Sequence, residues 1–223
     1  MKFWPFQRKS KKQKEITDSY TGDISLDKAV EVITSELGVG GYTGSGQVVN
    51  EKTAMQFSAV YACVSLLAGT IASLPFEVFK QIAPGETDID KSNPVYPIIN
   101  STPNPVITAY VFWETVCSEL FLNGNGYAVI SRSQNGAPSA IYWLPQRSVT
   151  PFLNPDKTRI WYRVDLGQAL NQVFDQDDIL HFPCIGWDGL RGMSPIACAS
   201  ESIGLGLAGE NFNSKFFTNA SAK

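Results

Sequence analysis

This chain of 223 residues has few of the side chains that most catalytic and metal sites require. It has one histidine, His181, and its four cysteines, Cys63, Cys117, Cys184 and Cys198, form no paired short spacing. A zinc site needs about four Cys, His or carboxylate ligands, so we expect no metal ion and no cofactor. The cysteines lie in apolar sequence, which predicts buried free thiols and a reducing compartment.

Charge is also scarce, and it is unevenly placed. The first fourteen positions hold six of the eighteen basic residues, which leaves 12 basic against 21 acidic residues, or about −9, for the rest of the chain. Such a body repels a phosphate backbone, so we do not expect it to grip nucleic acid tightly. The N-terminal residues lack the long apolar run of a secretory signal, and we expect a cytoplasmic origin.

The N-terminal part divides into an arm and a linker. Residues 1–22 are predicted to be a basic, disordered arm, either a solubilising tail or a contact for nucleic acid or an acidic partner. Residues 23–50 are predicted to hold a short helix and a glycine-rich linker, GVGGYTGSG. That glycine run has neither the Lys-Ser/Thr nor the preceding strand of a phosphate-binding loop, so nucleotide binding is not expected.

No charged residue occurs between Lys52 and Glu77. Within this stretch the apolar residues recur at spacings of four and three, which predicts one buried helix face made of Val60, Val64, Leu67, Ile71 and Leu74. The alternative is a membrane protein anchored by residues 53–76, but serine, threonine and glutamine dilute the apolarity, so we prefer a core helix. Residues 76–80 then alternate as a strand, and residues 83–90 are predicted to form a polar turn.

The middle of the chain is typical of an α+β fold. A second helix is predicted from about Thr108 to Gly124, where Asn123-Gly124-Asn125-Gly126 ends it and leads into a strand. Six short strands are predicted, over residues 127–132, 140–144, 149–153, 160–164, 172–174 and 179–182. Their spacing predicts a small antiparallel sheet or half-closed barrel packed by helices, in a domain spanning residues 51–193.

Residues 194–223 are predicted to form a long helix that leaves this domain. Ser194 can cap its N-terminus and Pro195 fits the first helical position. One side of the helix, to about Phe217, is apolar, with Leu205, Ala208, Phe212 and Phe216. Three glycines inside it (Gly204, Gly206 and Gly209) predict that another backbone comes close, from the sheet or from a neighbouring subunit.

His181, Asp188 and Ser194 lie within fourteen residues and raise the alternative of a hydrolase. No G-x-S-x-G turn surrounds Ser194, so a helix cap is the preferred interpretation. His181 is predicted to be a core or interface histidine bonded to a backbone carbonyl, and Asp188-Gly189 to be a turn. Four aromatic residues (Trp143, Trp161, Tyr162 and Trp187) could stack on nucleobases, but sheet packing and subunit contacts are preferred.

Four segments, taken in order, resemble the portal proteins of tailed double-stranded DNA bacteriophages. They are AVYACVSLLAGTIASLPFEVFK, FWETVCSELFLNGNGYAVISR, YWLPQRSVTP and the stretch DILHFPCIGWDGLRGMSPIACASESIGLGLAGENFNSKFF. The last contains the strand with His181, a glycine-rich turn, the Ser194-Pro195 helix start and a double phenylalanine. The resemblance covers roughly residues 51–220.

The resemblance implies a structural subunit without catalytic activity, in a dodecameric ring that forms the channel for DNA packaging and ejection. Residues 51–193 would form the wing of the ring, and the helix after Ser194 would lead to its stem. The implied partners are further copies of the chain, the terminase, the major capsid and head-tail adaptor proteins, and double-stranded DNA that passes without sequence-specific binding. No membrane partner is implied.

The resemblance also implies a place in the virion, at the portal vertex of the capsid, after assembly in the host cytoplasm. Because stem and clip segments do not follow, we expect a truncated portal, with a non-functional prophage remnant as the alternative. In a ring, different patches of identical subunits meet. The residues expected at such contacts are Trp187, Asp188, Arg191, Phe212, Phe216 and Phe217.

Overall fold

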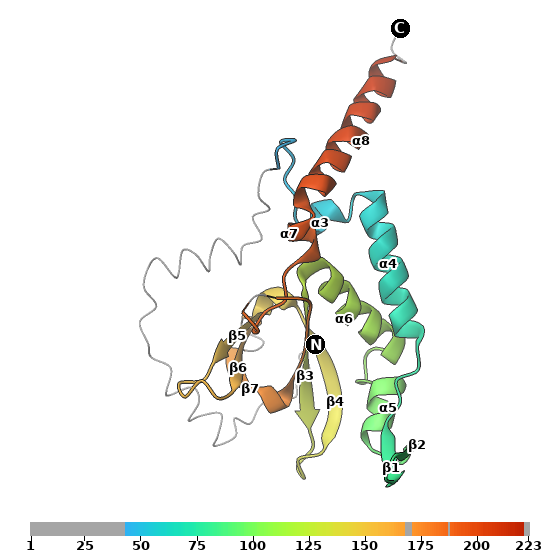
Figure 1. The fold of residues 1–223 in the computed structure, drawn as a ribbon, viewed down its shortest axis with the longest axis vertical. Helices are drawn as coiled ribbons and strands as arrows, with labels where there is room; N and C mark the ends of the chain where they lie inside the picture. Colours follow the sequence, from blue (N-terminus) through green and yellow to red (C-terminus); the bar gives the residue numbers. More distant parts are fainter. Residues whose placement is uncertain (1–42, 168–170, 187, 221–223) are drawn as a thin grey trace.

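The computed structural model describes residues 43–167, 171–186 and 188–220 (Figure 1). The predicted basic arm, the predicted short helix before the glycine run, and Trp187 lie outside these residues. The described helices are α3 (Glu51–Ala54), α4 (Ser58–Ser73), α5 (Val95–Asn100), α6 (Ala109–Asn123), α7 (Pro195–Cys198) and α8 (Ser200–Ala220). The strands are β1 (Phe79–Ala83), β2 (Glu86–Ile89), β3 (Asn125–Arg132), β4 (Pro138–Leu144), β5 (Val149–Leu153), β6 (Ile160–Asp165), β7 (Asn171–Asp175) and β8 (Ile179–Pro183).

The strands form two antiparallel sheets of three strands and a separate hairpin, which confirms the α+β class. The sheets have the orders β4-β3-β8 and β5-β6-β7, and the hairpin is β1-β2. Side chains from both three-stranded sheets meet in one shared core of Tyr127, Val129, Leu144, Val149, Tyr162, Val164, Phe174 and Ile179. All six strands predicted for the middle region are present, and each begins and ends within two residues of its predicted bounds.

Strand β3 is central because it has apolar residues on both of its faces. Tyr127 and Val129 point into the core between the sheets, whereas Ala128 and Ile130 contact the helical side. This is the alternation that a strand imposes on successive side chains. The helical side is filled by α6, and α4 packs against α6 in turn. The domain therefore has four layers, in the order α4, α6, the sheet that contains β3 and the sheet that contains β6.

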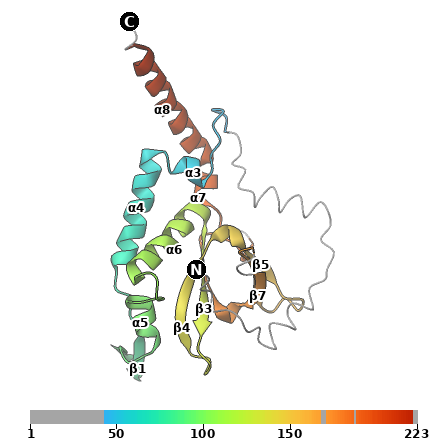
Figure 2. The same ribbon diagram turned by 180° about the vertical axis from the view of Figure 1, so that it is seen from behind.

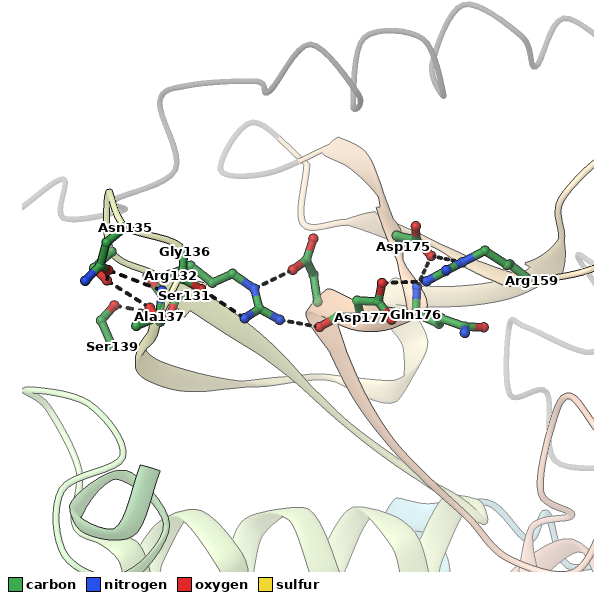
Figure 3. A network of polar contacts seen from close by, with 12 residues as sticks. Ser131, Arg132, Asn135, Gly136, Ala137, Ser139, Arg159, Asp175, Gln176 and Asp177 are labelled. Carbon is green, nitrogen blue, oxygen red and sulfur yellow. Dashed lines mark hydrogen bonds and ion pairs between the residues drawn. The ribbon is translucent and has the colours of Figure 1, made fainter. Parts of the chain in front are cut away.

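Two arginines tie the sheets together at the turn between β7 and β8 (Figure 3). Arg132 on β3 forms an ion pair with Asp178, at 2.9 Å, and donates to the Asp177 carbonyl oxygen. Arg159, which precedes β6, forms ion pairs with Asp175 and Asp177, at 3.0 and 2.6 Å. Exposed ion pairs add little stability singly, but here each sheet contributes one arginine to the same short turn. The turn that carries the chain from one sheet to the other is therefore held from both sides.

The stretch that was predicted to form one buried helix face begins with a separate short helix, α3, and α4 follows it, because the chain leaves helical bonding after Met55. Asn50 and Thr53 form a capping box that starts α3. In α4 the buried residues are Val64, Ala68 and Ala72, so the predicted face is shifted. Leu67 and Leu74 were predicted to be buried and are 50% and 57% exposed. Small side chains lie at the contact with α6, and the larger ones are left outside.

Other local predictions also need correction. Strand β1 starts three residues later than predicted, and part of the predicted polar turn is β2, which pairs with β1 around Gly85. The predicted helix from Pro195 is interrupted at Ala199, between α7 and α8. Of the four cysteines, which are all free, Cys117 is buried, but Cys63 and Cys198 are exposed.

Candidate assembly surfaces and the helix junction

The exit of helix α8 from the domain is built on close backbone packing. Helix α6 ends at Gly124, whose φ of 78° is left-handed, as the sequence predicted. A Cβ at Gly124 would lie 2.1 Å from the Met193 carbonyl oxygen, and one at Gly192 would lie 2.1 Å from the Gly124 carbonyl oxygen. The amide of Cys184 also donates to that Gly124 oxygen, at 2.8 Å. Only glycine allows the end of α6 and the segment before α7 to approach this closely.

Asn125, the first residue of β3, holds this segment with its side chain. Its Nδ2 donates to the Gly192 carbonyl oxygen at 2.9 Å, and its Oδ1 accepts from the Gly192 amide at 2.7 Å. Its Oδ1 also accepts from Nε2 of His181, at 3.1 Å. The side chain is almost fully buried, so these bonds replace the water that it would otherwise bind. Sequence reasoning treated Asn125 only as a turn residue and missed this role.

His181 lies between the two sheets rather than at an exposed edge. Its ring stacks on Tyr127, with centroids 4.4 Å apart, and its Nδ1 lies 3.3 Å from the hydroxyl of Tyr162. Burial lowers the pKa of His181 from 6.5 to about 4, so the ring is neutral at pH 7. His181 was predicted to be a core or interface histidine bonded to a backbone carbonyl; it is partly buried between the sheets, and both ring nitrogens bond side chains instead.

Ser194 and Pro195 occupy the predicted helix-start positions. The Ser194 Oγ accepts from the amide of Ala197 at 3.1 Å and donates to the Leu122 carbonyl oxygen at 2.7 Å, and Pro195 stands in the first turn. These bonds cap α7 and attach it to the end of α6. The Ser194 hydroxyl is thus engaged in structure, and its described partners do not include His181. The geometry gives no support to the hydrolase alternative.

The predicted interface residues come from two separate elements. Asp188 lies in the exposed turn before Gly192 and accepts from the amides of Leu190 and Arg191, at 2.8 and 2.9 Å. These bonds lower the pKa of Asp188. Arg191 is half-buried in the same turn. This turn therefore presents a fixed carboxylate beside a guanidinium, separate from the phenylalanines of α8.

Helix α8 carries an apolar stripe that the described chain leaves exposed. Leu205, Phe212 and Phe216 are 69%, 69% and 59% exposed, and spacings of seven and four place them on one face. We call these three residues the α8 stripe. Phe217 is equally exposed beside it. Figures 1 and 2 show α8 extending away from the sheets and the other helices.

The predicted close packing along α8 applies only to its first half. A Cβ at Gly204 would lie 2.5 Å from the Thr43 hydroxyl and one at Gly206 would lie 2.6 Å from the Phe57 ring, whereas one at Gly209 would meet nothing within 4 Å. Side chains, rather than a backbone, make these approaches. The half that follows carries three exposed phenylalanines (Phe212, Phe216 and Phe217), and Phe212 and Phe216 have no packing partner in another described element.

A second exposed apolar surface lies on α4 and was not predicted. Tyr61, Leu66 and Leu67 on this helix, and Leu74 directly after its last residue, are all at least half exposed, and we call these four residues the α4 outer face. An uncharged helix that is covered on one side only is unusual on a free surface, since surface helices normally carry charges there. The absence of charge between Lys52 and Glu77 was the signal that could have revealed it.

Neither a membrane span nor a metal cluster is found among the described residues. In that part of the chain no helix combines the length and the apolarity needed to cross a bilayer. In the same residues, His, Cys, Asp and Glu side chains do not gather in groups that could hold a metal ion.

The sequence and the fold can now be compared with known proteins. A model of the phage portal protein family matches residues 58–223. The chain belongs to the phage portal protein family. The portal protein of Enterobacteria phage HK97 is 33% identical over 193 residues, which cover 83% of this chain and 43% of that protein. The probable portal protein of Streptomyces phage phiC31 is 31% identical over 189 residues, covering 81% of this chain and 41% of that protein. The chain thus spans less than half the length of these curated relatives.

The solved structures that share this fold are of low sequence identity. A chain in the neck of an empty GTA particle has a TM-score of 0.64 and 19% identity, with coverage of 74% of this chain and 45% of that one. A chain in the neck of a native GTA (gene transfer agent) particle has a TM-score of 0.59 and 17% identity, with coverage of 92% and 50%. At such identities the similarity shows that the fold is shared.

Proposed function

We propose that the chain is a structural subunit of a portal ring, the head-tail connector at one capsid vertex of a phage particle. The observation that carries this proposal is the pair of exposed apolar surfaces, the α8 stripe and the α4 outer face, on a member of the portal family. A closed ring of identical subunits joins one patch of each subunit to a different patch of the next. Two distinct surfaces of this kind on one chain fit that geometry.

Within such a ring the domain with the two sheets would be the wing, and α8 would lead into the stem around the DNA channel. The GTA neck of the same fold was computed with C12 symmetry, which supports a ring of twelve. The acidic body of the chain suits DNA that passes without being held. The terminase, the major capsid protein and a head-tail adaptor are the proposed partners, and no catalysis is proposed for the subunit.

The predicted interface residues fall into two groups, which would form two separate contacts in this proposal. Phe212, Phe216 and Phe217 would contact a neighbouring subunit through α8. Asp188 and Arg191, with Trp187 between the same strand and helix, would form a second contact at the turn before α7. Each large apolar side chain of the α8 stripe would contribute about 1–2 kcal/mol when its exposed part is covered.

Sedimentation velocity over a range of protein concentrations tests the proposal. We expect the chain to self-associate, and Phe212→Ser combined with Phe216→Ser to shift it towards monomer by weakening association at least about tenfold. Val106→Ser is the matched control, because Val106 is 82% exposed but lies outside both surfaces. A chain that stays monomeric at every concentration, or equal effects of the double variant and the control, would contradict the proposal.

A further inference from the structure

The first described residues, Thr43 and Gly44, lie against the start of the α8 stripe. The Gly44 amide donates to both carboxylate oxygens of Glu201, at 3.0 and 3.3 Å. Thr43 is almost fully buried, and a Cβ at Gly204 would lie 2.5 Å from its hydroxyl oxygen. Glu201 is one helical turn before Leu205, the first residue of the stripe. The chain that precedes Thr43 therefore begins beside the stripe.

Residues 27–37, DKAVEVITSEL, have the pattern of a helix with one apolar face. The apolar residues recur at helical spacings, and the opposite side is polar. The apolar face holds Ala29, Val30, Ile33 and Leu37, and the polar side holds Lys28, Glu31 and Ser35. Such a helix would be about 16 Å long, and the distance from Leu205 to Phe216 along α8 is also about 16 Å. The two apolar faces therefore match in length.

The linker that follows this segment limits where the segment can bind. Residues 38–42, GVGGY, join Leu37 to Thr43. An extended chain gains at most about 3.5 Å per residue, so Leu37 lies within about 20 Å of Thr43 and of the first turns of α8. Gly38 suits the end of a helix, and the further glycines allow the chain to reverse. A helix over residues 27–37 can then lie back along α8, with Leu37 near Leu205.

The α4 outer face is a poorer match for this segment. Tyr61 and Leu66 are five residues apart, which places them about 140° apart around α4. The three residues of the α8 stripe fall within about 40° of one another. A helix packs along a narrow row of side chains, so the stripe is the surface that it fits.

The charges of the two elements agree with an antiparallel arrangement. Residues 27–37 hold three acidic residues against one lysine, a net charge of −2. Beyond Glu210, the part of α8 that the structure describes carries one charged residue, Lys215. If Leu37 lies near Leu205, the start of the segment, with Asp27, lies at the end of α8 that carries Lys215. Opposite charges then face each other across the contact.

We propose that residues 27–37 form a helix that covers the α8 stripe of the same chain and runs antiparallel to α8. Leu37 lies against Leu205, Ile33 against Phe212, and the first turn of the segment against Phe216. The contact forms within one chain, so it does not depend on ring formation. In the ring proposed above, a neighbouring subunit that binds the stripe has to displace this segment first. The segment thus keeps the stripe from water until the neighbour arrives.

A disulfide between two introduced cysteines tests this contact. Thr34 flanks the apolar face of the segment, and Gly209 lies beside the stripe, with nothing within 4 Å of its Cβ position. In a chain with Cys63→Ser and Cys198→Ser, which removes the exposed thiols, we expect Thr34→Cys and Gly209→Cys to become joined within one chain at low protein concentration. Non-reducing electrophoresis measures the rate and separates joined monomers from joined dimers.

The control for position pairs Thr34→Cys with Ser214→Cys. Ser214 is exposed on α8 as well, but it lies about 180° from Leu205 around the helix. We expect this pair to join at least about tenfold more slowly, because the local concentration of the segment is high on the stripe side only.

Variants of the segment show whether its apolar face makes the contact. Ile33→Ser combined with Leu37→Ser should slow the Thr34–Gly209 disulfide at least about tenfold, because two apolar contacts are lost. Lys28→Ser combined with Glu31→Ser is the matched control, which changes the polar side and should leave the rate unchanged. Equal rates at Gly209 and Ser214, an unchanged rate in the Ile33 and Leu37 variant, or joining only between chains would overturn the proposal. Sedimentation tests the ring contact separately, so failure of one proposal is distinguishable from failure of the other.

Discussion

Both halves of helix α8 carry large apolar side chains, but the halves differ in what surrounds those side chains. In the first half, Ile203 and Leu207 are buried against Val49, Ala54 and Ile196. In the second half, Phe212 and Phe216 face outward, and no apolar cluster of the described residues includes them. Hydrophobicity alone therefore does not tell which residues form the core of one chain. It tells which residues require a partner, and that partner can be a second molecule.

The difference between covered and uncovered apolar side chains of α8 is tested most directly by two leucines that lie two positions apart. Leu207 is 9% exposed and Leu205 is 69% exposed. We expect Leu207→Ala to lower the free energy of unfolding by about 2–4 kcal/mol, because it leaves a cavity, and Leu205→Ala to change it by less than about 0.5 kcal/mol. Urea denaturation of dilute protein measures both. Similar losses for the two variants would show that the covered and exposed faces of α8 do not differ as described.

Helix α7, which leads into α8, depends on Ser194. Replacing it with alanine removes the cap of α7 and the bond to Leu122, so we expect a loss of about 1–2 kcal/mol. Ser202→Ala is the control, since Ser202 is exposed within α8, and its expected change is below about 0.5 kcal/mol. The same urea titrations provide the measurement, and an equal cost at both serines would argue against the cap.

The smallest expected effect is on stability, when each of two glycines of α8 is replaced by alanine. At Gly209 there is open space for a Cβ, so Gly209→Ala should stabilise the helix by about 0.5–1 kcal/mol. At Gly204 the added methyl would press against Thr43, so overpacking should cancel or exceed the gain in helix propensity. Thermal melts followed by circular dichroism compare the two. Stabilisation by both substitutions would mean that the approach of Thr43 to α8 is loose.

Local chemistry explains what could be predicted from the sequence. The cap at Ser194 and the end of α6 at Gly124 each depend on residues close together in the chain, and both are confirmed. The family was also predictable, because it rests on several motifs in a fixed order.

The features that were missed depend on contacts between distant segments. Leu67 was predicted to be buried because it follows the spacing of a helix face, but the position of α6 against Val64 and Ala68 decides which face is covered. Asn125 was recognised only as part of a turn, since nothing local indicates that Gly192, 67 positions later, binds both ends of its amide. The expected interface role of Phe212 stays a prediction.

Because Cys63 is exposed on α4, the reactivity of its thiol can report on binding to this helix. Its thiol stands on a helix flanked by uncovered apolar side chains, while that of Cys117 is buried and the pKa of Cys117 is raised by burial. Alkylating reagents should therefore modify Cys63 far sooner than Cys117. A molecule that binds to α4 would shield Cys63 and slow its alkylation, whereas the buried Cys117 would stay unreactive in both cases. The rate at which Cys63 is alkylated therefore measures binding to α4 without any substitution in the chain.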